Sequence, residues 1–257
     1  MRLYVQVTEQ CDLACRHCGF DCRPGDAEPI RPETLAGFLG SLPRAPSHVA
    51  LTGGEPMLDV GRVLELTRLA RARGAVVRLI TNAGWARGAR ETEQLVRALG
   101  RAGIRGLWIS AGLYHDEQSP FNNSLNLLRA ARRIGIACHL NYVYLWPQQA
   151  GMRGKGLPAV DARVGDDVRT LALQRQQVSV AVGQPGAGGL SSGWSRMWDR
   201  GRARKLIDAL GAELAAGVRA DLLEAERAQG PSDLVGLGKD GRLLCSRIEG
   251  FGQAALP

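Results

Sequence analysis

The sequence predicts an α/β fold: a partial, open (β/α)6 parallel barrel with a short C-terminal extension. Strand-like runs alternate with helix-like runs at intervals of about 25 to 35 residues, the pattern of consecutive βα units around a parallel sheet. The chain has 257 residues and 45% apolar composition, which is enough for one substantial core. We therefore divide it into a barrel core, residues 1–200, and a helical extension with a short strand, residues 201–257.

Six runs have the composition of buried parallel strands, and loop residues follow each of them. They begin at Arg2 (RLYVQV), His48 (HVALTG), Val76 (VVRLIT), Gly106 (GLWIS), Ala137 (ACHLNYVYL) and Gln177 (QVSVAV). Parallel barrels carry their chemistry in the loops at the carboxyl ends of the strands. We therefore expect functional residues directly after these runs.

Helices are predicted between the strands. Asp59 precedes a segment whose apolar residues recur at helical spacing as far as Gly74, a suitable residue to end a helix. Residues 91–103 and 123–135 repeat this design, each with a final glycine.

Two Gly- and Pro-rich stretches interrupt the rhythm, residues 146–165 after the fifth strand and 183–201 after the sixth. Long loops of this kind commonly serve as lids or binding segments. Residues 202–228 are predicted as one or two helices, and DGRLLCSR, from Asp240, as a turn that leads into a short strand.

The net charge of +8 comes almost entirely from arginines spread over helix faces. No basic run is interleaved with aromatic residues as in single-strand binders, so we expect no nucleic-acid partner. No apolar stretch reaches the length of a membrane span, and the N-terminus enters a strand pattern without a leader. We expect a cytoplasmic protein without membrane association.

Four of the six cysteines lie between positions 11 and 22. Cys11, Cys15 and Cys18 form a C-x3-C-x2-C pattern directly after the first strand, which favours metal ligation over disulfides in a chain of this length. Three thiolates from one loop can hold an iron–sulfur cluster and leave one iron open to a ligand. A zinc site, or an electron-transfer cluster with Cys22 as fourth ligand, remains an alternative.

The second strand runs into LTGGEP, which contains Gly53, Gly54, Glu55 and Pro56. The two glycines remove side chains where backbone must approach a ligand, and the Glu55 carboxylate can accept hydrogen bonds from a bound ammonium group.

Together, the cysteine pattern and the GGEP turn resemble the radical S-adenosylmethionine (SAM) superfamily. The resemblance implies that the three cysteines hold a [4Fe–4S] cluster and that residues 53–56 contact the methionyl amine of SAM. It also implies an external electron donor, a flavodoxin or ferredoxin, and reductive cleavage of SAM to a 5′-deoxyadenosyl radical that abstracts a hydrogen atom from the substrate.

Further positions match the family. His17 precedes the third cysteine, where many members have an aromatic residue that covers the adenine. ITNAGW, with Asn82, looks like the family's TNG turn, and Ala83 occupies the usual glycine position. Ser110, at the end of the fourth strand, resembles the polar residue that touches the SAM ribose or carboxylate.

The segment YHDEQSP resembles one found in peptide- and metabolite-modifying members, which implies a catalytic role for His115 and Asp116. An ordinary helix cap is the alternative for these two residues.

RGRA, with Arg202, and DGRLLC, ending at Cys245, resemble sequences that lead into the SPASM or twitch extension of peptide maturases. Twelve residues follow Cys245, too few for a complete auxiliary cluster, so we expect a truncated extension. Cys138 is predicted to be a core residue. A thiol near a carbon radical can donate a hydrogen atom, and Cys245 is the candidate donor.

The leading hypothesis is a radical SAM enzyme that modifies a ribosomal peptide or another natural-product precursor, so the expected partner is a peptide or small-molecule substrate. The alternatives are an activase of glycyl-radical enzymes and a non-catalytic iron–sulfur protein.

Overall fold

The computed structural model describes residues 1–116, 118–144, 173–182, 189–196, 201–209, 216, 219, 234–240, 243–245 and 253–254. The strands are β1 (Arg2–Thr8), β2 (His48–Gly53), β3 (Val76–Thr81), β4 (Ile104–Ala111), β5 (Ala137–Tyr144), β6 (Leu190–Arg196), β7 (Leu234–Leu237), β8 (Leu243–Cys245) and β9 (Gln253–Ala254). The first five and β8 lie where the sequence predicts strands.

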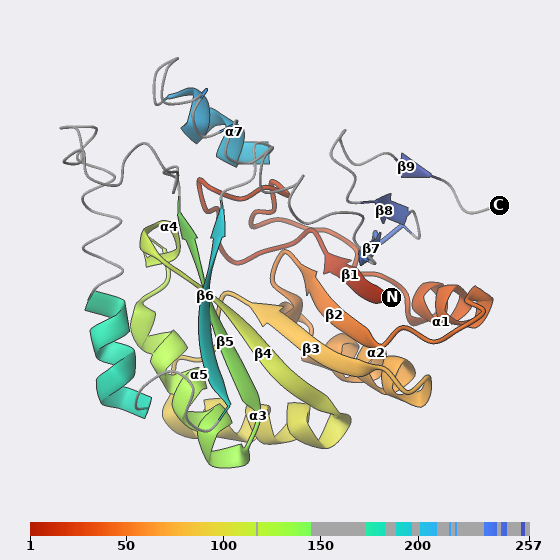
Figure 1. Ribbon diagram of the computed structural model, residues 1–257, viewed down its shortest axis with the longest axis horizontal. Helices are drawn as coiled ribbons and strands as arrows, with labels where there is room; N and C mark the ends of the chain where they lie inside the picture. The colour runs from red at the N-terminus through yellow and green to blue at the C-terminus, as the bar shows by residue number, and fades with distance from the viewer. Residues whose placement is uncertain are drawn as a thin grey trace.

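These strands form one sheet in the order β6-β5-β4-β3-β2-β1-β7-β8-β9 (Figure 1). The neighbours from β6 to β7 run parallel, whereas β8 and β9 continue the sheet antiparallel. Since β6 and β9 are the two edges, the sheet stays open. The predicted open α/β fold is confirmed, and β7 adds a seventh parallel strand that the sequence did not predict.

The helices are α1 (Pro32–Ser41), η1 (Pro56–Leu58), α2 (Val60–Ala72), α3 (Ala89–Ala102), α4 (Leu113–Asp116), α5 (Phe121–Ile134) and α7 (Gly201–Asp208). The predicted end signals of α2, α3 and α5 are confirmed. The Asp59 carboxylate accepts the backbone N–H of Arg62 at 2.8 Å, a standard N-cap for α2. Gly103 and Gly135 end α3 and α5 in the left-handed conformation, with φ of 115° and 82°.

One face of the sheet carries the core. Alternate residues of the strands, such as Leu3, Val5 and Val7 of β1, are fully buried in one cluster with apolar side chains of α1, α2, α3 and α5. Residues that point to the other face, such as Arg78 of β3 and Trp108 of β4, are half-buried. The helices thus cover one face, and the functional loops lie along the edge where the parallel strands end.

The sixth strand predicted from Gln177 is wrong, because residues 173–182 form a helix. Val178, Val180 and Val182 alternate along the sequence like a strand, but Val178 and Val182 also stand four apart, as on one helical face. These two are buried in the core, whereas Val180 is 84% exposed. The sixth strand is instead β6, which lies within the predicted loop of residues 183–201 and pairs with β5.

The C-terminal part joins the same sheet. β7 pairs parallel with β1, and the Lys239 ammonium lies 2.8 Å from the Glu9 carboxylate beyond it. The boundary at residue 200 stays a prediction. The predicted lid of residues 146–165 lies outside the described residues, as does most of 202–228 beyond α7. None of the helices that the structure describes is both long and apolar enough to span a bilayer.

Candidate functional site

The predicted cysteines lie in one loop, residues 10–23, that follows β1; we call it the cysteine loop. The loop closes on itself, because Gln10 and Arg23 form a β-bridge and the Cys11 N–H donates to the Arg23 carbonyl at 3.1 Å. Inside it, the Cys18 N–H donates to the Cys15 carbonyl at 3.1 Å. Asp21 adopts a left-handed φ of 58°, which is rare for a residue with a side chain. The cysteines therefore stand on a compact, tightly turned backbone.

Cys15 is buried and Cys11 is half-buried, and burial raises the pKa of each thiol to about 12. Two donors approach the Cys11 sulfur, the Leu13 N–H at 3.4 Å and Asn82 Nδ2 at 3.7 Å. Hydrogen bonds of this kind stabilise negative charge on sulfur. These two donors therefore offset part of the free-energy cost of placing a negatively charged thiolate at this partly buried position.

Cys22 lies beside Cys18. A hydrogen bond from the Cys22 thiol is the main cause that lowers the pKa of Cys18 to about 6, against the effect of burial. The same contact, together with burial, raises the pKa of Cys22. The two thiols therefore interact, and the contact favours the ionised form of one of them.

The GGEP turn packs directly on the cysteine loop. The N–H groups of Gly54 and Glu55 donate to the carbonyls of Thr8 and Gln10 at 2.7 and 2.8 Å. A Cβ on Gly54 would lie 1.9 Å from the Gln10 oxygen, and one on Gly53, whose φ is 130°, would lie 2.3 Å from the Thr8 oxygen. Only glycines permit this contact, so they bring the turn against the loop.

Glu55 is only 1% exposed and is fully engaged by the protein. Its Oε1 accepts the Met57 N–H at 3.0 Å and the Thr81 hydroxyl at 2.8 Å, and its Oε2 accepts the Asn82 N–H at 2.8 Å. Burial raises its pKa to about 7, although these hydrogen bonds lower it. The carboxylate thus joins the end of β2 to the end of β3. Pro56 begins η1 directly after it.

Asn82 connects the turn after β3 to the cysteine loop. Its Nδ2 donates to the Asp12 carboxylate at 2.8 Å, and its Oδ1 accepts the Gly84 N–H at 2.7 Å. Between them, Ala83 has a φ of 59°. This left-handed backbone is the conformation that glycine adopts most easily, so Ala83 keeps the shape of a glycine turn.

Two histidines meet on the other side of the loop. His17, 8% exposed, contacts the His115 ring edge-on at 4.4 Å between centroids and the Tyr114 ring at 5.5 Å. Burial lowers the pKa of both imidazoles, that of His115 to about 4, so both are neutral at pH 7. Neither Nδ1 atom has a hydrogen-bond partner within the described part of the chain. Asp116 ends α4, but its side chain lies outside that part.

The remaining predicted residues are placed differently. Ser110, near the carboxyl end of β4, is half-buried at the same edge as the loops. Cys138 is buried in the core, as predicted. The backbone of Cys245 pairs with Val235, which pairs with Leu3, near the amino end of β1. The structure thus does not bring Cys245 to the cysteine loop, and its side chain is not among those described.

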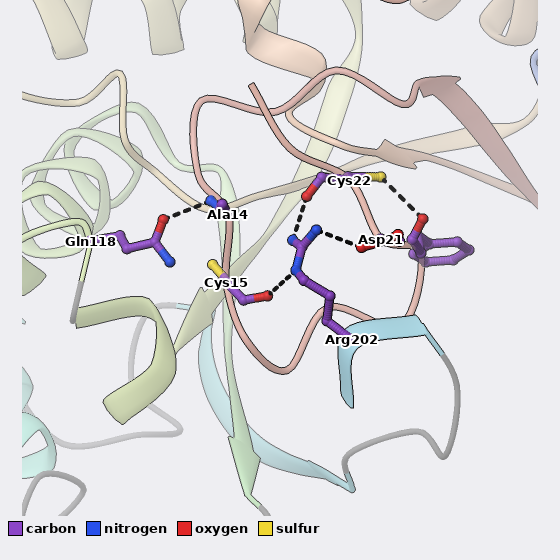
Figure 2. A network of polar contacts seen from close by, with 7 residues as sticks. Ala14, Cys15, Asp21, Cys22, Gln118 and Arg202 are labelled. Carbon is purple, nitrogen blue, oxygen red and sulfur yellow. Dashed lines mark hydrogen bonds and ion pairs between the residues drawn. The ribbon is translucent and has the colours of Figure 1, made fainter. Parts of the chain in front are cut away.

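Two residues that contact the cysteine loop are not predicted by the sequence. Arg202, from α7, donates to the Cys15 carbonyl and forms an ion pair with Asp21, while the Gln118 side chain accepts the Ala14 N–H at 2.6 Å (Figure 2). They stand 187 and 104 positions from their partners. No local spacing could reveal such contacts, and the resemblance named Arg202 only as part of RGRA.

The chemistry of the donor set fits an iron–sulfur cluster. In the part of the chain that the structure describes, no three His, Cys, Asp or Glu side chains are gathered into a preformed site for a single ion. Three cysteines on one closed loop, with N–H donors at the Cys11 sulfur, are a suitable ligand set for a cluster.

A family model matches this chain over residues 5–146, and its description is the radical SAM superfamily. The protein YydG of Bacillus subtilis strain 168, named for peptide biosynthesis, is 21% identical over 131 residues, 50% of this chain and 41% of YydG. YfkA of the same strain is 33% identical over 82 residues, 30% of this chain and 22% of YfkA. The chain thus matches less than half the length of these curated relatives.

Solved structures share the fold. SuiB of Streptococcus suis, bound to precursor peptide SuiA, is 12% identical with a TM-score of 0.55, over 94% of this chain and 58% of SuiB. The protein anSMEcpe, with bound AdoMet and Cp18Cys peptide, is 14% identical with a TM-score of 0.51, over 76% of this chain and 50% of its own. At this identity the likeness shows the fold alone.

Proposed function

The chain belongs to the radical SAM superfamily, and we propose that it binds a [4Fe–4S] cluster and SAM and uses them to modify a peptide. One observation carries this proposal. The loop with Cys11, Cys15 and Cys18 and the GGEP turn are in direct backbone contact at the carboxyl edge of the sheet. This contact supports the proposal that the two halves of the family motif belong to one site.

When bound, the cluster would supply the electron that breaks the C5′–S bond of SAM, giving methionine and a 5′-deoxyadenosyl radical that would take a hydrogen atom from the substrate. The protein's own part is to hold the ligands and shape the edge. Cys11, Cys15 and Cys18 supply three thiolates, and the electron comes from an external donor, a flavodoxin or ferredoxin.

Glu55 contributes by fixing the GGEP turn. Its two oxygens already accept three hydrogen bonds from the protein, so we propose that it sets the position of the turn's backbone beside the methionyl end of SAM. Asn82, Ser110 and His17 lie on neighbouring segments of the same edge, and we propose that they contact the rest of SAM.

A peptide is the proposed substrate. The name of YydG and the peptides in the SuiB and anSMEcpe structures support this choice. His115 and Asp116, on α4, follow the carboxyl end of β4 and are proposed to face the substrate. The placement of Cys245 by its strand register gives no support to a role as hydrogen-atom donor.

The test is reductive cleavage of SAM. Anaerobically reconstituted protein with dithionite and SAM should form 5′-deoxyadenosine, measured by liquid chromatography and mass spectrometry. Cys15→Ala should lose both iron and product. Cys138→Ala, which removes a buried thiol of the core, should retain both.

Absence of 5′-deoxyadenosine in the wild-type protein, or its undiminished formation by Cys15→Ala, would overturn the proposal. A cluster whose electron paramagnetic resonance (EPR) spectrum does not respond to SAM would indicate a non-catalytic iron–sulfur protein.

A further inference from the structure

We propose that Arg202 is a positioning residue, which holds the cysteine loop in a ligand-ready shape before a cluster binds. The loop's shape is a property of the protein alone; only the meaning of that shape for a cluster rests on the proposed function.

Arg202 makes four hydrogen bonds to the loop, and Figure 2 shows the three that come from its side chain. Its Nε donates to the Cys15 carbonyl at 3.0 Å, and its Nη2 to the Cys22 carbonyl at 2.5 Å. Its Nη1 lies 2.7 Å from the Asp21 carboxylate, and its backbone N–H donates to the Cys18 carbonyl at 3.0 Å. One residue thus fixes the carbonyls of three cysteines.

These contacts constrain the backbone and leave the sulfurs free. Because each carbonyl is adjacent to the Cα that carries the thiol, holding the carbonyls of Cys15, Cys18 and Cys22 sets where their side chains begin. Hydrogen bonds to carbonyls use none of the sulfur lone pairs, so metal ligation remains open to the thiolates.

The arrangement is specific to arginine. The guanidinium is a planar fork with five N–H donors at fixed angles, and here it reaches three acceptors in different directions at once. A lysine has one ammonium at the end of a flexible stem and cannot reproduce this geometry. The Arg202 side chain is only 20% exposed, which limits competition from water.

The ion pair with Asp21 stabilises the most strained point of the loop. Asp21 has a φ of 58°, a left-handed conformation that is unfavourable for a residue with a Cβ. Its carboxylate is tied to Arg202 by a charge-assisted hydrogen bond, the stronger type. The tight turn between Cys18 and Cys22 is therefore maintained by a contact from outside the loop.

Arg202 also places a positive charge beside a site that is expected to become anionic. A cationic group next to a cluster favours its reduced, more negative form. Removal of this charge should therefore make a bound cluster harder to reduce.

The test uses Arg202→Met, Arg202→Lys and the control Lys205→Met, which removes a charge from the exposed face of the same helix. Amide hydrogen exchange of residues 10–23 is measured in the metal-free protein. In Arg202→Met we expect about tenfold faster exchange or more, because charge-assisted hydrogen bonds are lost. Arg202→Lys should give an intermediate rate, and Lys205→Met the wild-type rate.

A second readout follows reconstitution. The midpoint potential of the cluster, determined by EPR-monitored titration, should move to more negative values in Arg202→Met and less so in Arg202→Lys. If Arg202→Met fails to fold, judged by circular dichroism, Asp21→Asn replaces it. This variant removes the negative charge at a half-exposed side chain but keeps an oxygen acceptor, so it should accelerate exchange of the loop less than Arg202→Met does.

Wild-type exchange rates of the loop in Arg202→Met, or in the substitute Asp21→Asn, would overturn the inference. Equal acceleration in Lys205→Met would do the same, since it would assign the effect to the stability of α7. Failure of the wild-type protein to cleave SAM would contradict the proposed function but would leave the hydrogen-exchange result valid. Failure of the proposed function and failure of the inference about Arg202 can therefore be distinguished.

Discussion

Replacing Gly54 with alanine would place a methyl group inside the contact between the GGEP turn and the cysteine loop. The new Cβ would stand 1.9 Å from the Gln10 oxygen and 2.5 Å from the Gln10 carbonyl carbon. Both are rigid backbone atoms, so no side chain can rotate away to relieve the clash. The turn and the loop must therefore separate.

The expected magnitude follows from what the separation breaks. Two hydrogen bonds, from Gly54 to Thr8 and from Glu55 to Gln10, span this contact. Their loss costs about 1 kcal/mol each, and overpacking adds about 1–3 kcal/mol. The lower entropy of unfolded alanine returns about 0.5–1 kcal/mol, so we expect a net destabilisation of about 2–4 kcal/mol.

The assay is equilibrium urea unfolding of the metal-free protein. The matched control is Gly37→Ala in α1, where a Cβ meets no atom within 4 Å. Since alanine favours a helix over glycine, this control should raise the free energy of unfolding by about 0.5–1 kcal/mol. A Gly54→Ala protein within about 0.5 kcal/mol of the wild type, with the control as expected, would refute the close-contact reasoning.

Two further predictions concern buried groups. Burial raises the pKa of Glu55 from 4.5 to about 7, so its stabilisation is complete below about pH 4.5 and is lost as the pH rises through 7. Between pH 5 and 8, the free energy of unfolding of the wild type, measured by urea unfolding, should therefore fall relative to that of Glu55→Gln. The fall should be up to about 1.4 kcal/mol per pH unit. A difference between the two proteins that stays constant with pH would contradict this. Val178→Ala should destabilise by about 1–3 kcal/mol, whereas Val180→Ala should change the free energy of unfolding by less than about 0.5 kcal/mol. Equal losses at both positions would argue for a strand instead of the helix at 173–182.

Much of the fold was predictable because its signals are local. Asp59 before α2 and the glycines after α3 and α5 act within a single turn of chain, and the structure confirms them. The sequence suggests a strand from Gln177, where the structure has a helix at residues 173–182. Val178, Val180 and Val182 fit the two-residue period of a strand, and Val178 and Val182 also fit the 3.6-residue period of a helix. Only the packed core distinguishes them. The true β6 has few apolar residues and is defined by its pairing with β5.

The candidate site divides in the same way. The cysteines and the GGEP turn were predictable as motifs, since each is contiguous in sequence. The partners of Glu55 were not, because Thr81 becomes its neighbour only when β3 lies beside β2. The contacts of Arg202 and Gln118 depend on the whole sheet, and no spacing between them and the loop could have revealed them.

The residues that hold the cysteine loop lie far from it in the sequence. This separation determines when, during synthesis and folding, the loop acquires its final shape. During synthesis the loop leaves the ribosome long before Asn82, Gln118 and Arg202, the last of which is 187 positions from Cys15. Contacts of such separation form late in folding, after the intervening strands have assembled. A nascent chain would thus present the four thiols of this loop on a loosely structured segment, open to oxidation and to the wrong metals. For the proposed cluster this means that the ligand loop would be held in its final shape only in the folded chain, so the cluster would be expected to enter after folding.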